Sequence, residues 1–247
     1  MDAFIATALD PMTALIVGVV FCAVVVRAAF GFGDVLVSVP ILVLVVDPRL
    51  VIPLMGLVGA TNALLLLLRE RTAVQWKPVR FLLMASVVGV PIGAWLLTWV
   101  DARSINLALG VTLVMFCAWS LRGRSMPRLT SPLWAFPFGF GAGLMGGAVT
   151  ATGPPIVVYS TTQDWKPEER RATMQGFFLP NGLFVLVSHF VADLWTPQVL
   201  HTYALTIPVC ICALPVGAAL ASRWSQARFE RLTLIVLLGT GVLLLVS

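Results

Sequence analysis

The chain has 247 residues, of which 59% are hydrophobic and only 11% are charged, and its formal net charge is +5 at pH 7. A soluble domain is roughly 45–50% apolar and about 25% charged, and 247 residues could not hide this much apolar side chain from water. The composition therefore excludes a soluble enzyme, a disordered chain and a nucleic-acid partner, and it predicts an all-α polytopic membrane protein surrounded by the lipid bilayer.

A membrane span needs about 20 apolar residues, and the sequence contains both interrupted and uninterrupted stretches of that kind. In chain order we expect an interrupted region at 12–46, three spans, a second interrupted region at 133–163 and three more spans. The expected spans are residues 50–68, 79–100, 104–121, 172–192, 197–221 and 229–246. The interruptions contain glycine and proline, which weaken or end helices.

Most of the 16 Lys and Arg residues fall in four loops, and this bias predicts how the chain crosses the membrane. The four clusters are Arg69, Arg71, Lys77 and Arg80; Arg122, Arg124 and Arg128; Lys166, Arg170 and Arg171; and Arg223, Arg228 and Arg231. Because cytoplasmic loops carry an excess of basic residues, both loops flanking residues 133–163 belong on the cytoplasmic side. That region is too short for two full crossings. We expect a re-entrant hairpin there, either a hairpin or a full span at 12–46, and both termini in the periplasm.

Short landmarks recur in the same order in the two halves of the chain. Phe30-Gly31-Phe32-Gly33 recurs as Phe138-Gly139-Phe140-Gly141, and Val90-Pro91-Ile92-Gly93-Ala94 recurs as Leu214-Pro215-Val216-Gly217-Ala218. Each half has one broken region followed by three spans, and since three is odd the halves are inverted relative to each other. We therefore predict two inverted repeats, residues 1–125 and 126–247, in one membrane domain. Paired broken helices in inverted repeats are typical of a transporter.

The same residues carry a resemblance to a known family. Gly31-Phe32-Gly33, Pro40 and the glycine-rich run at 139–147 that leads to Gly153-Pro154-Pro155 resemble the TauE/SafE sulfite exporter family over nearly the whole chain. The resemblance implies a permease of the bacterial inner membrane for sulfite, sulfonates or related sulfur-containing anions. Asp34 departs from the family pattern, in which a small residue is more usual.

The second break combines features that suit an anion. Pro154 and Pro155 fit the first turn of a helix, and a helix N-terminus offers partial positive charge and amide donors. Thr150 and Thr152 add hydroxyl donors, and Gly153 lets an oxyanion approach the backbone. These last three residues are candidates for substrate binding. The alternative is a tight helix kink whose hydroxyls cap backbone groups.

The first break places an acid and a base close together in the sequence. Asp34 begins a short helix and either caps it or titrates and couples transport to protons, as acids inside membranes often do. Apart from Arg80 and Arg231 at the ends of their spans, Arg27 is the only Lys or Arg within an apolar segment. It either binds the anion with its guanidinium fork, or it snorkels to the membrane surface or pairs with Asp34. Gly31 and Gly33, in the break itself, are also candidates for substrate binding.

Three amide side chains lie within predicted spans. Asn62 and Asn181 are near the middle of their spans, and Gln175 is near the cytoplasmic end of its span. A buried amide needs a hydrogen-bond partner, so each either joins two helices or contacts the ligand, and all three are candidates for substrate binding. His189 has no second His or Cys at metal-ligand spacing, and we expect it at the membrane interface.

The sequence thus favours a secondary transporter that moves sulfite, organosulfonates or related sulfur-containing anions by alternating access, with Asp34 as the candidate for proton coupling. No Walker loop is present, and we expect no metal, cofactor or catalytic group. One alternative is a transporter or channel for another small anion. Another is an intramembrane enzyme, which the missing nucleophile–base and zinc motifs disfavour. A homodimer remains open.

Overall fold

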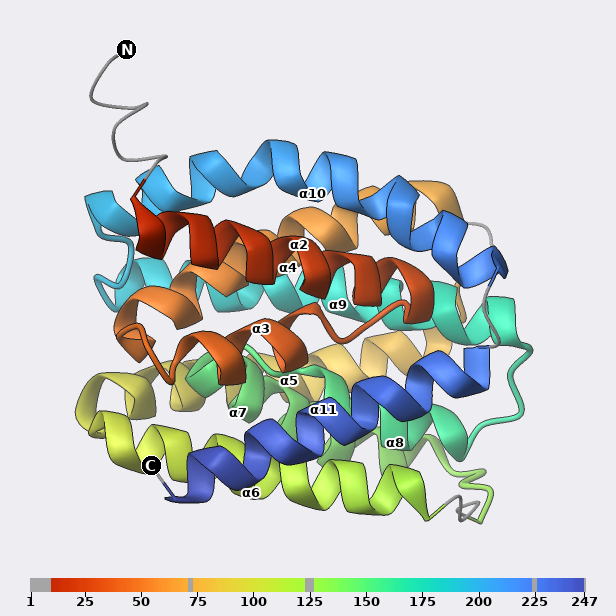
Figure 1. Ribbon diagram of the computed structural model, residues 1–247. Helices are drawn as coiled ribbons and strands as arrows, with labels where there is room; N and C mark the ends of the chain where they lie inside the picture. Colours follow the sequence, from red (N-terminus) through yellow and green to blue (C-terminus); the bar gives the residue numbers. More distant parts are fainter. Residues whose placement is uncertain (1–9, 71–72, 123–126, 224–225, 247) are drawn as a thin grey trace.

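The computed structural model describes residues 10–70, 73–122, 127–223 and 226–246, and its regular elements in these ranges are all helices (Figure 1). The elements are α2 (Pro11–Phe30), α3 (Asp34–Leu42), α4 (Pro48–Glu70), α5 (Trp76–Trp99), α6 (Ala102–Leu121), the 3-10 turn η2 (Pro132–Trp134), α7 (Ala135–Val149), α8 (Gly153–Thr161), α9 (Pro167–Val191), α10 (Pro197–Arg223) and α11 (Gln226–Val246). The predicted all-α class is confirmed.

Six of the described helices are long and apolar enough to cross a membrane. They are α2, α4, α5, α6, α9 and α10. The sixth predicted span, residues 229–246, corresponds to α11, which has 21 residues. The first interrupted region resolves into unequal pieces, since α2 has 20 residues, about 30 Å at 1.5 Å each, whereas α3 has only 9. The short helix expected to reach residue 46 ends at Leu42.

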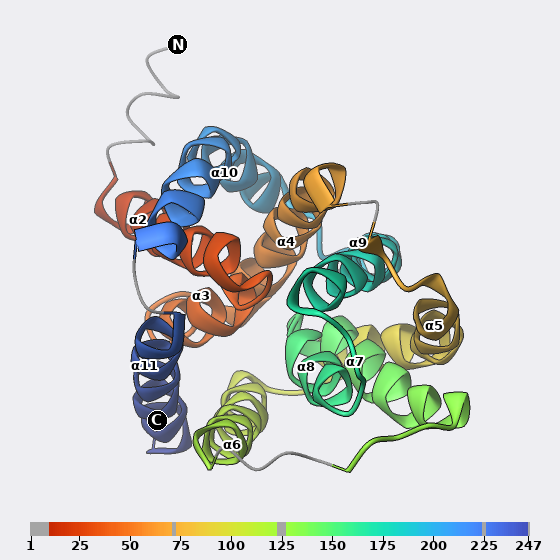
Figure 2. The ribbon, with the colours of Figure 1, turned by 90° about the vertical axis from the view of Figure 1, so that its right-hand side faces the viewer.

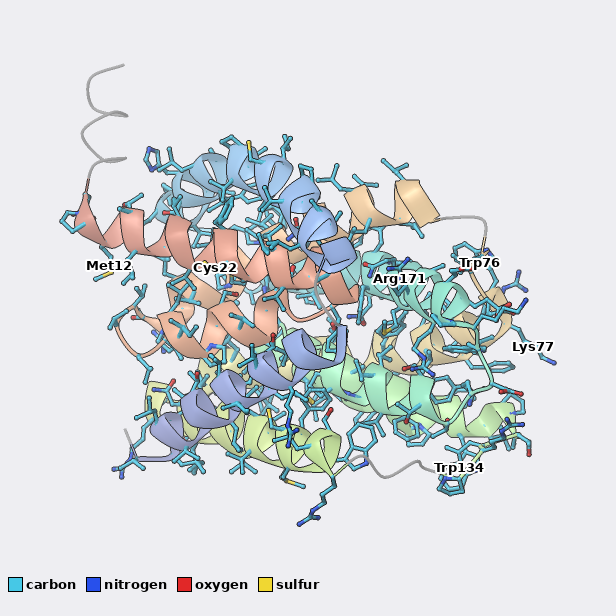
Figure 3. All side chains as sticks on the ribbon, turned by 45° about the vertical axis from the view of Figure 1, so that its right-hand side comes forward. Met12, Cys22, Trp76, Lys77, Trp134 and Arg171 are labelled. Carbon is cyan, nitrogen blue, oxygen red and sulfur yellow. The ribbon has the colours of Figure 1, made fainter. Side chains whose placement is uncertain are left out.

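The two broken regions enter the molecule from opposite ends. In Figure 1, α2 runs from the left edge past the middle, and α3 returns to the left; α7 comes in from the right, and α8 returns to the right. The start of α2 and the end of α11 lie at the same left-hand end. Trp76, Lys77 and Trp134 all lie toward the other end, far from Met12 (Figure 3). The structure describes all side chains of the basic cluster at Lys166, Arg170 and Arg171. In the other three clusters some side chains lie outside the described ones, namely Arg69, Arg71, Arg124, Arg223 and Arg228.

The second broken region enters and leaves at one end of the molecule. Arg128 Nη2 lies 3.0 Å from Asp164 Oδ1, and the backbone N–H of Leu129 donates to the carbonyl of Thr162 over 3.3 Å. Gln163 Nε2 also donates to the Leu129 carbonyl over 3.2 Å. These contacts join the segment before α7 to the segment after α8. The region is therefore a helical hairpin that enters and leaves at one end of the molecule, as expected from its basic flanks.

Glycines let helices from the two halves of the chain approach at backbone distance. A Cβ atom on Gly217 of α10 would lie 2.5 Å from the carbonyl oxygen of Val25 in α2, and one on Gly89 of α5 would lie 2.5 Å from that of Phe140 in α7. Gly93 meets the α7 backbone at Leu144 in the same way. Small residues at such contacts let helices pack tightly inside a membrane. Each copy of the recurring proline-glycine landmark thus packs on the broken region of the other half.

Viewed along the helices, the molecule has three groups (Figure 2). The first contains α2, α3, α4 and α10, the second contains α5, α7, α8 and α9, and the pair α6 and α11 lies beside both. The first two groups each contain helices from both predicted repeats. The repeat boundary at 125/126 falls among residues 123–126, outside the described ranges, and the division into inverted repeats stays a prediction.

Candidate functional site

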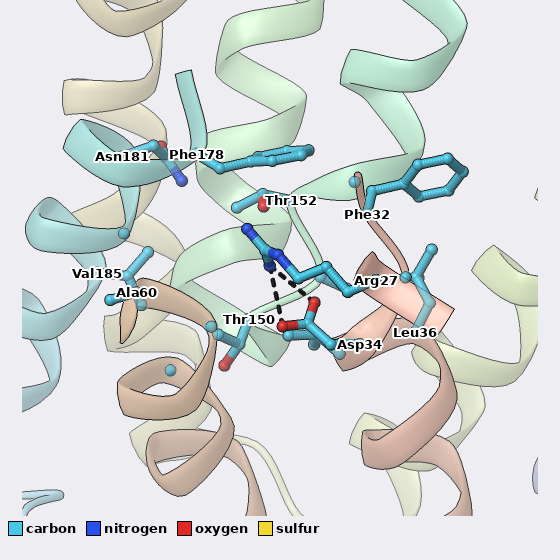
Figure 4. Close-up of a pocket in the computed structure, with 17 residues that line it drawn as sticks. Arg27, Phe32, Asp34, Leu36, Ala60, Thr150, Thr152, Phe178, Asn181 and Val185 are labelled. Atoms are coloured by element: carbon cyan, nitrogen blue, oxygen red, sulfur yellow. Dashed lines mark hydrogen bonds and ion pairs between the residues drawn. The ribbon is translucent and has the colours of Figure 1, made fainter. Parts of the chain in front are cut away.

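A small cavity of about 40 Å³ lies where the two breaks meet (Figure 4). Seven of the predicted site residues line it: Arg27, Gly33, Asp34, Thr150, Thr152, Gly153 and Asn181. The other three predicted substrate-binding residues do not line the cavity. They are Gly31, Asn62 and Gln175, and hydrogen bonds connect them to the residues that do line it. The structure therefore gathers the whole predicted set around one centre.

The N-termini of two short helices reach this cavity from opposite directions. α3 begins after Gly33, whose φ of 109° is a left-handed conformation that glycine adopts without strain. α8 begins at Gly153, where a Cβ atom would lie only 3.5 Å from Cδ1 of Leu36 in α3. Both helix dipoles place their positive ends at the cavity wall, which favours a negative charge there.

The two N-termini differ in the hydrogen-bond donors they offer. Pro154 and Pro155 stand in the first turn of α8 and have no amide hydrogen, so this helix lacks two of the donors that a helix start usually presents. The expectation that α8 supplies free N–H groups is to that extent wrong. The first turn of α3 contains no proline, and its residues Asp34, Val35 and Leu36 all line the cavity.

Arg27 and Asp34 form a buried ion pair at the centre of the wall. Arg27 Nη1 donates to Asp34 Oδ1 over 2.8 Å and to Oδ2 over 2.9 Å, and the two residues are 4% and 2% exposed. Arg27 Nη2 donates to Oε1 of Gln175 over 3.0 Å, and the guanidinium carbon lies 5.6 Å from the ring centre of Phe178. Its Nε has no hydrogen-bond partner among the described residues. Of the alternatives for Arg27, snorkelling is wrong and pairing with Asp34 is observed.

Asp34 does not cap its helix. The N-cap of α3 is Gly33, so no side chain at this position caps the helix. The carboxylate instead accepts hydrogen bonds from Arg27 and from Asn62 Nδ2, the latter over 3.0 Å. The capping interpretation is therefore wrong.

The two mid-span asparagines have different surroundings. Both are fully buried, but Asn62 donates to Asp34, whereas neither Oδ1 nor Nδ2 of Asn181 has a partner among the described residues. Asn181 lines the cavity and lies near Thr152 in Figure 4. A buried amide without partners costs about 1–3 kcal/mol, and a ligand in the cavity would remove that cost.

Gln175 fixes the tip of the first broken region. Its Nε2 donates to the carbonyl of Gly31, and its Oε1 accepts from Arg27. Gly31 has a φ of 83° and caps α2 through its N–H, which donates to the Arg27 carbonyl. Gln175 therefore positions both the tip and the guanidinium without lining the cavity.

Thr150 and His189 anchor the second break. Thr150 has a φ of 60°, a strained conformation for a β-branched residue, and its Oγ1 donates to the carbonyl of Ile52 in α4 over 2.9 Å. His189 Nε2 lies 2.9 Å from the carbonyl oxygen of Gly147, in the last turn of α7. His189 is fully buried within the protein, two residues before the end of α9, and its expected place at the membrane interface stays a prediction.

The sequence analysis missed the apolar part of the cavity wall. Phe178 and Val185 come from α9, as does Asn181, and Phe32 and Leu36 come from the first break; the small residues Gly56, Gly59, Ala60 and Gly182 complete this part. One signal for α9 was available in the sequence, because a single helix face recurs every three or four residues. That face carries Arg171, Gln175, Phe178, Gly182, Val185 and His189.

The fold and the site define a multi-pass helical membrane protein with a cavity, lined in part by a buried ion pair, at the meeting point of two short helices, an arrangement typical of transporters. The chain belongs to the sulfite exporter TauE/SafE family, whose model matches residues 16–244. This confirms the predicted family and assigns the chain to membrane transport of sulfur-containing anions. Comparison with curated proteins and with solved structures gives no match.

Proposed function

We propose that this protein is a secondary transporter that moves sulfite, organosulfonates or related anions across the bacterial inner membrane by alternating access. One observation carries the proposal: a cavity between two helix N-termini is lined by a buried arginine–aspartate pair and by an asparagine that has no hydrogen-bond partner among the described residues. The unpartnered Nδ2 of Asn181 and the Nε of Arg27 are donors that an oxyanion can satisfy. The hydroxyl of Thr152 lines the same space.

The charge of the site argues for coupling to a proton. Arg27 and Asp34 together are neutral, so a singly charged anion, such as hydrogen sulfite or a sulfonate, that enters alone leaves one uncompensated negative charge at membrane depth, which is costly. Protonation of Asp34 frees Arg27 Nη1 for the anion and restores neutrality. The anion and the ionised Asp34 carboxylate thus compete for one guanidinium, and the anion travels with a proton.

The size of the cavity fits a small head group. One water needs about 10–15 Å³ of such space, so about 40 Å³ holds roughly three waters. Sulfite, with four non-hydrogen atoms, is of this size. The site takes the oxyanion itself, and any organic tail has to lie outside it.

The orientation follows from the basic loops. If the end that carries Lys77, Arg128 and Lys166 faces the cytoplasm, as the excess of basic residues favours, both termini are periplasmic. In this proposal the protein acts as a carrier, either alone or as a homodimer.

The test is uptake of radiolabelled sulfite into proteoliposomes. We expect saturable uptake that is driven by an inward proton gradient and that falls at least about tenfold in the R27Q/D34N double variant, which removes both buried charges and so avoids an unpaired one. The surface variant R128Q is the control and keeps its rate. Uptake that rises linearly with concentration indicates the alternative, an anion channel, and uptake equal to that of empty liposomes contradicts the proposal.

A further inference from the structure

A second and larger cavity opens beside the central one. Its volume is about 590 Å³, and it lies between α6, α8, α9 and α11. Phe32, Gly33 and Leu36 line both cavities, so the larger one adjoins the central site at the first break. We call this larger cavity the vestibule. It reaches the first turn of α9, at the end of the molecule where α9 begins (Figure 1).

The vestibule has a positively charged wall. Arg170 and Arg171 line it, and Glu168 is its acidic lining residue, which leaves a net charge of about +1. Arg170 is half-buried, and its Nε is enclosed without a hydrogen-bond partner among the described residues. The stem of Arg171 packs on the tip of the first break, 3.6 Å from where a Cβ of Gly31 would be.

Arg171 also lies one helical turn before Gln175, the residue that holds Arg27. Residues four apart on a helix share a face and lie about 6 Å apart along it. The same face of α9 therefore leads from the vestibule arginine to the guanidinium of the central site, and an anion in the vestibule is one helical turn from the residues around Arg27.

The other wall of the vestibule is aromatic. Phe116 and Trp119 of α6 both line it, and their ring centres lie 6.3 Å apart. Leu234 and Leu237 of α11 extend this apolar surface. One cavity thus presents guanidinium groups to a charge and rings to an apolar group.

We propose that the vestibule is a second binding site, for an oxyanion that carries a small apolar or aromatic group. The charged head lies on Arg170 and Arg171, and the tail packs on Phe116 and Trp119. The inference rests on the proposed function for the nature of the anion, a sulfonate. The two volumes, about 40 and 590 Å³, support it, because the central cavity has no room for a tail that the vestibule holds with ease.

The test is calorimetric titration of the purified full chain in detergent with two probes, benzenesulfonate and sulfite. We expect R170Q to weaken benzenesulfonate binding about tenfold, since it removes a charge-assisted hydrogen bond. W119A weakens benzenesulfonate by a similar factor and leaves sulfite unchanged. R128Q, an arginine 72% exposed and paired with Asp164 outside the vestibule, is the matched control.

The R27Q/D34N double variant separates this inference from the proposed function. We expect it to abolish sulfite binding and to retain benzenesulfonate binding that R170Q weakens further. The vestibule site is refuted if the double variant binds neither benzenesulfonate nor sulfite, and if R170Q and W119A alone do not change benzenesulfonate binding. That result leaves the central site supported. Sulfite binding that survives the double variant instead refutes the central site, while the effects of R170Q and W119A on benzenesulfonate still decide the vestibule.

Discussion

Arg27 Nη1 lies 2.8 Å from Asp34 Oδ1 although the two residues are seven positions apart. In an unbroken helix that separation is about 10 Å along the axis. The chain reverses at Gly31 and Gly33, both with left-handed φ, and this reversal brings the two charges together. The ion pair and the cavity beside it therefore exist because the helix is broken.

The first prediction concerns the competition for Arg27. Replacing Asp34 with Asn keeps the size and shape of the side chain but removes its negative charge. The guanidinium of Arg27 is then available to the anion at every pH. We expect the wild-type protein to bind sulfite more tightly as the pH falls, because protonation of Asp34 releases the guanidinium. The D34N variant should bind more tightly than wild type at neutral pH. Its affinity, corrected for the ionisation of sulfite itself, should not change with pH.

The control is the same titration with methanesulfonate. Its charge does not change over this pH range, whereas sulfite itself gains a proton as the pH falls. A pH dependence that D34N retains with methanesulfonate contradicts coupling through Asp34.

The second prediction compares the stability changes caused by replacing Asn181 and Asn62. Asn181→Leu removes an amide that has no partner in the part of the chain that the structure describes, so we expect the stability to rise, by up to about 1–3 kcal/mol, while sulfite binding weakens. Asn62→Leu removes a hydrogen bond to Asp34 and should lower stability by a similar amount. Thermal unfolding in detergent, with and without sulfite, measures both effects. A loss of stability in N181L would mean that the amide has a structural role.

The third prediction tests the glycine contacts between the halves. Gly217→Ala places a methyl group 2.5 Å from the Val25 carbonyl oxygen, which requires α10 and α2 to separate, and we expect a loss of about 1–3 kcal/mol. Gly239→Ala is the matched control, since nothing lies within 4 Å of its Cβ position; it should be neutral or gain up to about 1 kcal/mol from helix propensity. Equal melting temperatures for the two variants would show that the helices are not in close contact.

The fourth prediction concerns the sidedness of the membrane. In a background with the four native cysteines replaced by alanine, we expect Arg128→Cys and Asp164→Cys to react with an impermeant maleimide only after cells are permeabilised. Arg49→Cys, in the first turn of α4 at the opposite end (Figure 1), should react in intact cells. Labelling of residues 128 and 164 from different sides contradicts the hairpin, and labelling of both in intact cells inverts the orientation.

Much of the site was predictable because its residues are chemically out of place in lipid. Arg27 and Asp34 stand in apolar surroundings, where a charge needs a partner, and their spacing across a glycine-rich break indicates that partner. The second hairpin was predictable from its basic flanks together with its length. These arguments rest on charge and length, which the sequence states directly.

The remainder depended on tertiary contacts. Nothing in the local sequence distinguishes Asn62, which donates to Asp34, from Asn181, whose amide has no hydrogen-bond partner among the described residues. The burial of His189 depends on the end of α7, 42 residues earlier in the chain. The capping role expected for Asp34 followed local rules, but the ion pair with Arg27 is stronger than a capping bond, so the carboxylate turns to Arg27.

The packing of helices from one half of the chain against helices from the other half has a consequence for biogenesis. The Val25 surface of α2 is completed by Gly217 of α10, a helix that leaves the ribosome almost 200 residues later. The first span to be inserted therefore waits in the bilayer for one of the last before its close packing is complete. Contacts between such distant residues form slowly, and neither half of the chain carries a full set of packing partners by itself. Translation of the whole protein thus precedes maturation of its core.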